Sequence, residues 1–304
     1  MQNDKFYPGS ALRKFWNPTA FAFEFLTVLF LVFFVFTWMF LSFLSKKNKS
    51  KIFLSVGYTI ATALAFFLPW AFASIGSKLP VYPMLNPLVV IFQSFLRGFG
   101  KTGQVVGDNN LIGSPLWQGM PYIFGAQILG GFAGFALFIG LFYSFKAMFK
   151  TNVDYEWLKS FKLSNLFAKE HHLTLGKFSA KEALFITMLI TLLPFSAMID
   201  TTNYQLNHFQ IKLIELLVVG IIIFISSYFD FFAFHLIFPL IELVIKTALL
   251  VKSNIENKNE NLKAYLQSLY RFLIVLALTI IIPIIIAFIA IGIKSKTGVI
   301  ISVS

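Results

Sequence analysis

The stretch that decides the fold runs from Ser77 to Leu96 and reads SKLPVYPMLNPLVVIFQSFL. Its second part is a short apolar run that follows Asn86 and Pro87. Asparagine is a preferred helix cap, and proline is favoured at the first helical position. Nine or so helical residues extend about 14 Å, whereas the hydrocarbon core of a bilayer is about 30 Å thick. The stretch therefore predicts a half-helix that enters the membrane and turns back. The alternative is a complete span from Val81 to Phe99 with two prolines in its first turn.

Long apolar runs on both sides of this stretch predict a membrane protein. Hydrophobic residues make up 58% of the 304-residue chain and charged residues only 12%, about half the charged share of a soluble domain. A span needs about 20 apolar residues, and six runs qualify: Phe21–Leu44, Ile52–Ile75, Tyr122–Met148, Lys181–Met198, Ile211–Phe229 and Leu269–Ile293. The 39 phenylalanines are typical of an AT-rich bacterial genome, and we interpret them as coding bias. The expected location is a bacterial plasma membrane, with the chain crossing it several times.

A second short apolar run, Pro239–Val251, gives the chain an internal repeat. Two spans, a breaker segment, a short proline-led helix and one more span occur before residue 150 and again after residue 178. Glu24 precedes Pro87 by 63 residues, and Glu182 precedes Pro239 by 57. An odd number of spans per repeat places the two copies in opposite orientations, as in many transport proteins. The expected fold is all-α, with six transmembrane helices and two re-entrant half-helices in an inverted repeat. Its parts are a first half, 1–150, with a re-entrant helix at 86–97, a polar linker, 151–178, and a second half, 179–304, with a re-entrant helix at 239–251.

Three of these segments resemble one known family in their residues. Glu24-Phe25-Leu26-Thr27 is similar to the opening helix of the aquaporin and glycerol-facilitator family. Leu85-Asn86-Pro87-Leu88-Val89-Val90 resembles the first Asn-Pro-Ala loop of that family, and the segment from Tyr122 to Gly134 resembles its third helix. The resemblance implies a channel, and because no catalytic or metal-binding motif occurs in the sequence, we expect no enzyme activity, cofactor or metal. It also implies a homotetramer in the lipid bilayer, with a small neutral solute as the permeant.

The resemblance assigns roles to the first motif. Asn86 would donate a hydrogen bond to the permeant, and Pro87 and Leu88 would start the half-helix beside it. The helix N-terminus adds unpaired N–H groups and partial positive charge, which attract the oxygen of a passing solute and repel cations. The alternative is that Asn86 is only a helix cap.

The second motif departs from the family pattern. Ala233–Ile241 aligns only through Pro239, since Phe238 stands where the family has asparagine and Ile241 where it has arginine. The family's spacing places four residues around the constriction of the pathway: Phe66, Ser226, His235 and Ile241. Such a ring is largely apolar and suits an amphipathic solute. We therefore expect facilitated diffusion of glycerol-like polyols and/or water, in a divergent facilitator and not a strict water channel.

Other residues are expected to support the structure. In the resembled family, the glutamates equivalent to Glu24 and Glu182 accept hydrogen bonds from the re-entrant loops, and Gln127 belongs to the matching third helix. The alternative places both glutamates at the headgroup level. Gly130 and Gly134 have the spacing at which two helices approach closely. For Asp230 and Glu242, at the second short helix, we expect interfacial positions, with a proton relay as the alternative.

Composition and motifs weigh against several classes of protein. Cysteine is absent, which excludes disulfides and thiolate metal sites. No Walker loop, zinc-protease motif or dinucleotide-binding turn occurs, and His171-His172 is interpreted as a solvated pair. The net charge of +12 comes from lysines beside the spans, so we expect no nucleic-acid partner.

The basic residues also raise a conflict of orientation. The family has its N-terminus in the cytoplasm, which would place the first turn, the linker and the last hairpin outside. These three segments and their immediate flanks hold 16 of the 25 Lys and Arg residues, and the positive-inside rule predicts the reverse. A small secondary transporter, the membrane subunit of an uptake complex and a non-transporting structural protein therefore stay open as alternatives.

Overall fold

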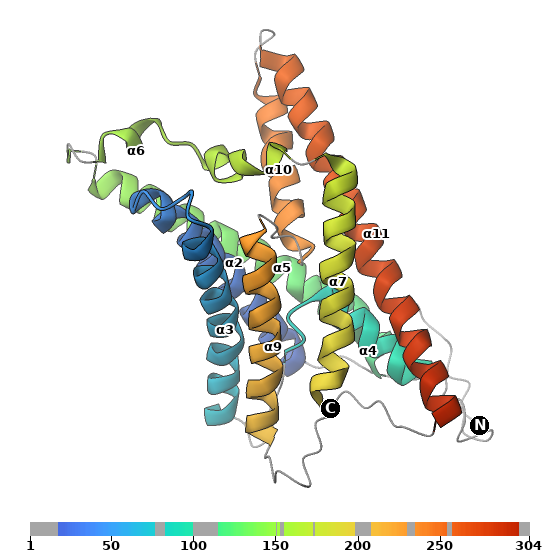
Figure 1. Ribbon diagram of the computed structural model, residues 1–304. Coiled ribbons are helices and arrows are strands. Elements are labelled where there is room, and N and C mark those ends of the chain that lie inside the picture. Colours follow the sequence, from blue (N-terminus) through green and yellow to red (C-terminus); the bar gives the residue numbers. More distant parts are fainter. Residues whose placement is uncertain are drawn as a thin grey trace, which may run out of the picture.

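The computed structural model describes residues 18–76, 83–99, 115–149, 151–152, 155–172, 174–197, 208–229, 235–253 and 257–297. Within these ranges every element of regular secondary structure is a helix (Figure 1). The elements are α2 (Pro18–Leu44), α3 (Lys51–Gly76), α4 (Pro87–Phe99), α5 (Pro115–Met148), α6 (Trp157–Ser160), η2 (Leu163–His172), α7 (Leu175–Ala197), α9 (His208–Tyr228), α10 (Ile237–Val251) and α11 (Lys258–Thr297).

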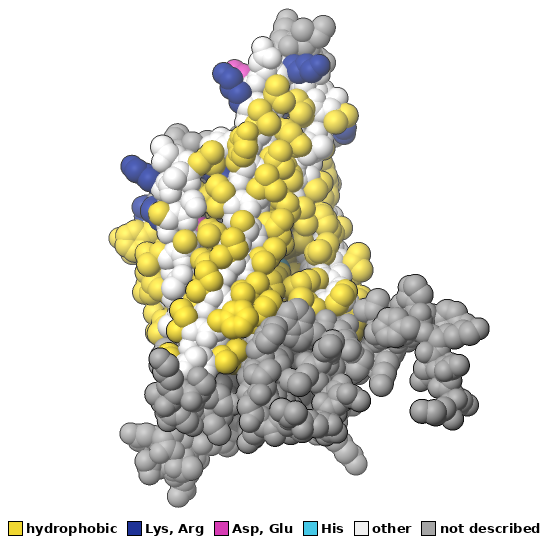
Figure 2. All heavy atoms as spheres, turned by 90° about the vertical axis from the view of Figure 1, so that its right-hand side faces the viewer, with side chains coloured by type: hydrophobic (Ala, Val, Ile, Leu, Met, Phe, Trp, Pro, Cys, Tyr) yellow, Lys and Arg dark blue, Asp and Glu magenta, His cyan; other side chains and the backbone are white. Residues whose placement is uncertain are grey.

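Four of the helices are long and apolar enough to cross a membrane: α2, α3, α5 and α11. Helices α7 and α9, with 23 and 21 residues, fall outside this set, although the described part of α9 includes the shorter apolar stretch Leu213–Tyr228. The chain is thus an all-α protein with several helices that fit a bilayer. Figure 2 shows apolar side chains covering most of the described surface on the side of α11, as expected of a surface in contact with lipid.

Helices α4 and α10 are too short to cross a bilayer. Their 13 and 15 residues span about 20 Å and 22 Å. In Figure 1 both begin near the middle of the molecule, and they extend toward opposite ends. Helix α4 begins at Pro87 and residues 83–86 are not helical, so the alternative of a continuous helix from Val81 is wrong.

The two halves of the chain share one packing scheme. Helix α2 packs against α3 and α5, and in the second half α7 packs against α9 and α11. Helix α3 packs against α9, which joins the halves. The short helix α4 lies against α5 and α11, and α10 lies against the same two helices. In each half the short helix therefore packs against the last long helix of its own half and against the last long helix of the other half.

Phenylalanine builds the core between these helices. Phe36 of α2 is fully buried, and its ring centroid lies 5.0 to 5.9 Å from the centroids of four other phenylalanine rings. Those rings come from α5, η2 and α10: Phe135, Phe138, Phe167 and Phe238. Aromatic contacts of this kind add to the apolar area that they bury. Reading the phenylalanines only as coding bias therefore missed their structural role.

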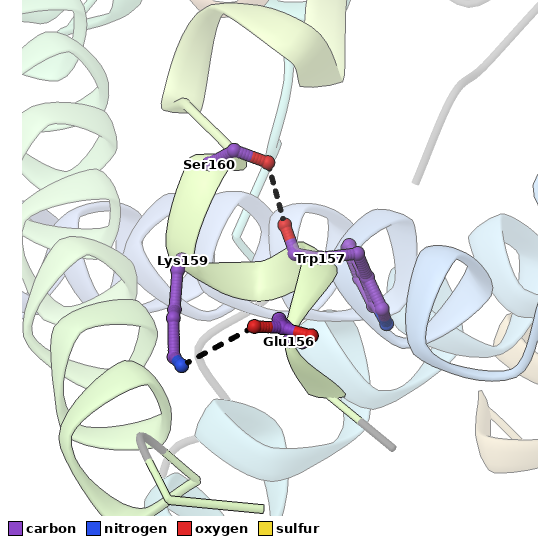
Figure 3. A network of polar contacts seen from close by, with 4 residues as sticks. All are labelled: Glu156, Trp157, Lys159 and Ser160. Carbon is purple, nitrogen blue, oxygen red and sulfur yellow. Dashed lines mark hydrogen bonds and ion pairs between the residues drawn. The ribbon is translucent and has the colours of Figure 1, made fainter. Parts of the chain in front are cut away.

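The linker between the halves packs onto the bundle more closely than a polar segment would. Leu158, Phe161, Leu166 and Phe167 are all buried. Lys146 of α5 donates hydrogen bonds to the carbonyl oxygens of Lys159 and Phe161, at 3.2 and 3.0 Å. The outer side of α6 is polar (Figure 3), with Lys159 and Glu156 3.8 Å apart. Both of these side chains are exposed, so their ion pair contributes little.

Small residues allow α2 and α5 to approach closely. A Cβ atom added at Gly130 would meet the carbonyl oxygen of Phe25, and one added at Gly134 would meet that of Leu29. Both contacts would be shorter than any real Cβ contact. The predicted packing face is therefore confirmed. At Gly131 an added Cβ would instead meet the side chain of Ile237, so this glycine makes room for the start of α10.

Candidate functional site

The candidate site is the junction where the segments leading into α4 and α10 meet, against α2 and α5. We define the junction by Glu24, Leu85, Asn86, Gln127 and His235. Glu24 is 4% exposed and Gln127 1% exposed. The two Glu24 carboxylate oxygens accept hydrogen bonds from the backbone N–H groups of Met84 and Leu85, the second at 3.2 Å. The Gln127 amide donates to the same carboxylate at 3.0 Å.

The Glu24 carboxylate thus does what the resemblance implies for this position, because it holds the segment that leads into the first short helix. It lies inside the helix bundle. A buried polar group is costly unless it is hydrogen-bonded, and here one carboxylate serves three donors from two other elements.

Leu85 has a backbone conformation that residues other than glycine rarely adopt. Its φ is 62°, in the left-handed region where a non-glycine residue is strained by about 1 kcal/mol or more. The Leu85 N–H is held by Glu24, and the next residue, Asn86, caps α4 by accepting the Leu88 N–H on its side-chain oxygen at 3.0 Å. The strained residue turns the chain sharply into the helix. Capping by Asn86 is therefore present, and a contact with a permeant would be an additional role of the same side chain.

His235 joins the two short helices. One ring nitrogen, Nε2, lies 2.7 Å from the carbonyl oxygen of Leu85, and the other, Nδ1, accepts the N–H of Ile237 at 3.2 Å. Since Nδ1 accepts, the proton of a neutral ring is on Nε2, which donates to Leu85. The residue before Asn86 and the start of α10 are therefore bridged by one buried imidazole.

The second motif contributes apolar side chains at this place. Phe238 is 8% exposed, Ile241 is fully buried, and Pro239 is also buried. The Phe238 ring centroid lies 5.9 Å from that of Phe36 and 6.1 Å from that of His235. Where the resembled family has polar groups, this chain therefore has packed apolar side chains.

The structure does not bring the four expected constriction residues into one hydrogen-bonded ring. Ser226, His235 and Ile241 are buried, and Phe66 is partly buried. The Ser226 hydroxyl donates to the carbonyl oxygen of Ile223 at 3.0 Å, and both His235 nitrogens bond to backbone atoms. In the described residues no hydrogen bond links any two of the four side chains.

Further polar groups are buried in the second half. Glu182 of α7 is fully buried, as expected of a counterpart to Glu24. Its expected partner, the segment before His235, lies outside the described residues. Glu242 of α10 is 4% exposed and accepts the Ser268 hydroxyl of α11 at 2.8 Å. Glu242 therefore lies inside the bundle and is bonded to α11. Asp230 lies outside the described residues.

Comparisons with known proteins do not assign this site. No protein-family model matches the chain, and searches of curated proteins and of solved structures found no match. Among the described residues no group of three or more His, Asp or Glu side chains is placed to hold a metal ion. His171 and His172 fall at the end of η2, and their side chains lie outside the described set.

The His235 bridge leads to a prediction. Replacing His235 with Phe keeps an aromatic ring but removes both nitrogen contacts. The buried Leu85 carbonyl and Ile237 N–H would then lose their partners, at about 1–3 kcal/mol each. We expect a loss of stability of about 2–6 kcal/mol, measured as a lower melting temperature in detergent. Phe66→Leu is the matched control for an aromatic change outside the bridge, and an equal loss in both variants would contradict the assignment.

Proposed function

We propose that this chain is a membrane channel for the facilitated diffusion of small neutral solutes, glycerol-like polyols and/or water. The observation that carries the proposal is the junction, where two short helices begin beside each other and run apart. Helix N-termini that face each other within a membrane offer N–H donors and partial positive charge to a solute oxygen. The same charge disfavours cations.

The repeated packing scheme supports the architecture that such a channel needs. We infer that α2, α3, α5, α7, α9 and α11 are six spans and that α4 and α10 are re-entrant half-helices in an inverted repeat. In support, α2 has the same neighbours in the first half that α7 has in the second. The buried Glu24 and Glu182 lie at matching places on α2 and α7. We include a homotetramer in the proposal because the resemblance implies it.

The side chains at the junction favour a neutral, partly apolar solute. Asn86 brings a polar amide to the start of α4, while Phe238 and Ile241 bring apolar surface to the start of α10. Without an arginine at Ile241, the pathway lacks the fixed positive charge with which such pores exclude protons and cations. Polyols combine hydroxyl groups with a carbon backbone and match this lining better than water alone.

Changing the charge of Asn86 tests the proposal. Asn86→Asp keeps the oxygen that caps α4 but places a negative charge where the permeant would pass. We expect the glycerol permeability of proteoliposomes, measured by stopped-flow light scattering, to fall at least tenfold, or a cation leak to appear. Asn48→Asp, in the turn between α2 and α3, is the control. If Asn86→Asp behaves like this control, Asn86 is only a cap.

A second candidate, a small secondary transporter or the membrane subunit of an uptake complex, is favoured by a different observation. Glu242, Lys246 and Arg271 are all at least 90% buried on α10 and α11. Ionisable residues inside transmembrane helices are costly and often belong to ion or substrate pathways. In this candidate, transport would couple to an ion gradient and saturate with solute concentration.

A further inference from the structure

The basic side chains of the described residues gather at one end of the molecule. Four lysines lie in the turn 45–51, three in the segment 146–162, two at the start of α7 and three in 252–263, and most are exposed. Among the described residues, the exposed carboxylates in these segments are Glu156 and Glu260, while Glu182 beside Lys181 is buried. We call this the lysine-lined end. Figure 2 shows dark blue side chains at the upper end of the visible face.

Contacts between distant segments place these groups together. The Lys51 ammonium lies 5.9 Å from the ring centroid of Tyr228, which brings the start of α3 to the end of α9. Lys181 at the start of α7 donates to the carbonyl oxygen of Phe229 at 3.4 Å. The rings of Phe43 and Phe161 are 4.9 Å apart, which adds the end of α2 and the linker. The convergence therefore follows from the packing and not only from the order of the segments.

The same end has the aromatic side chains of a membrane interface. Tyr143, Tyr228 and Tyr270 are 57%, 44% and 51% exposed, and each lies within a few helical turns of the lysines. Tyrosine is enriched at the headgroup level, and lysine stems extend along apolar surface with the ammonium in the headgroup layer. Tyrosine and lysine side chains together at the end of apolar helices are typical of the headgroup layer, so this end fits a lipid surface better than a protein partner.

We propose that the lysine-lined end binds the anionic phospholipid headgroups of the cytoplasmic leaflet. The Pro18 end of α2 then faces the opposite side of the membrane, the reverse of the orientation in the resembled family. Anionic lipids attract clustered lysines beside transmembrane helices, and this bias sets orientation during insertion. Fourteen of the 25 basic residues of the whole chain fall in 45–51, 146–181 and 252–263, against eleven elsewhere. An inverted repeat tolerates either orientation, so this inference does not depend on the proposed channel.

The absence of cysteine makes the orientation directly measurable, because one introduced cysteine is the only thiol. Thr151→Cys and Asn257→Cys place it at exposed positions of the lysine-lined end, and Gln210→Cys places it at an exposed position of the other end. Intact cells are treated with a membrane-impermeant maleimide, and a second sample is permeabilised first. We expect Gln210→Cys to be labelled in intact cells. The labelling of Thr151→Cys and of Asn257→Cys should increase at least tenfold when the cells are permeabilised.

Labelling of Thr151→Cys or Asn257→Cys in intact cells, alone or together with Gln210→Cys, would overturn the proposed orientation. Labelling of all three after permeabilisation shows that each thiol can react, so a missing signal in intact cells reports the side of the membrane. Because the proposed channel works in either orientation, its flux assay can succeed or fail independently of this result.

Lipid binding is tested on the purified full chain. We expect micelles that contain phosphatidylglycerol to raise the melting temperature by several degrees relative to phosphatidylcholine. Replacing Lys46, Lys47, Lys49 and Lys51 by Gln should reduce that shift by at least half, whereas replacing them by Arg should preserve it. An equal shift in the Gln variant would overturn headgroup binding by this end.

Discussion

Glu24→Ala is expected to lower the stability of the folded protein by about 3–9 kcal/mol and to abolish solute flux. The substitution leaves three buried donors without their acceptor: the N–H groups of Met84 and Leu85 and the amide of Gln127. Each such group costs about 1–3 kcal/mol when it loses its partner. The strained turn at Leu85 would relax at the same time, so α4 would lose its fixed starting point.

The measurement combines thermal unfolding in detergent with flux into proteoliposomes. Glu24→Gln keeps one acceptor oxygen and should be intermediate. Glu156→Ala removes an exposed carboxylate that is 3.8 Å from Lys159 and should change stability by less than about 0.5 kcal/mol. If Glu24→Ala is no less stable than Glu156→Ala, the role assigned to Glu24 is wrong.

The double substitution Gly130→Ala with Gly134→Ala should separate α2 from α5. Each new methyl group would occupy the place of a backbone carbonyl oxygen, of Phe25 or of Leu29, and a carbonyl cannot move aside as a flexible side chain can. Overpacking of this kind costs about 1–3 kcal/mol per site, so we expect a total loss of about 2–6 kcal/mol. Because Glu24 and Gln127 lie on these two helices, the junction would be displaced as well.

Gly140→Ala is the matched control on the same helix. A Cβ atom added at Gly140 meets nothing within 4 Å, and alanine is the better helix former by about 1 kcal/mol. The control should therefore be neutral or slightly stabilising in a thermal unfolding experiment. Equal effects of the double variant and of the control would show that α2 and α5 are not in close contact.

Local chemistry made part of the fold predictable. Asn86 and Pro87 carry a capping signal within two residues, and α4 begins at Pro87 as expected. The helices α5, α7 and α11 begin seven, six and eleven residues before the expected starts, at Pro115, Leu175 and Lys258. Apolar runs mark only the part of a helix that lies in lipid, while polar residues can continue the same helix into the headgroup region.

The contacts of the junction could not be predicted from the residues alone. Glu24 and Gln127 are 103 residues apart, and His235 is 150 residues from Leu85. The partner of His235 is a backbone carbonyl, which leaves no mark in the sequence. The resemblance indicated a supporting role for Glu24. It placed His235 in a constriction, but in the structure both ring nitrogens of His235 form hydrogen bonds with backbone atoms. The role of phenylalanine in the core could not be predicted either, because the number of phenylalanines does not indicate which of them contact one another.

The central claim is that the chain is a passive channel for small neutral solutes, and the concentration dependence of transport tests it most directly. Purified protein in proteoliposomes is exposed to increasing glycerol gradients, with and without ionophores that collapse ion gradients. A channel predicts an initial rate that rises linearly with the gradient and is unchanged by ionophores. Saturation of the rate, or its loss on addition of an ionophore, would contradict the channel and favour the transporter.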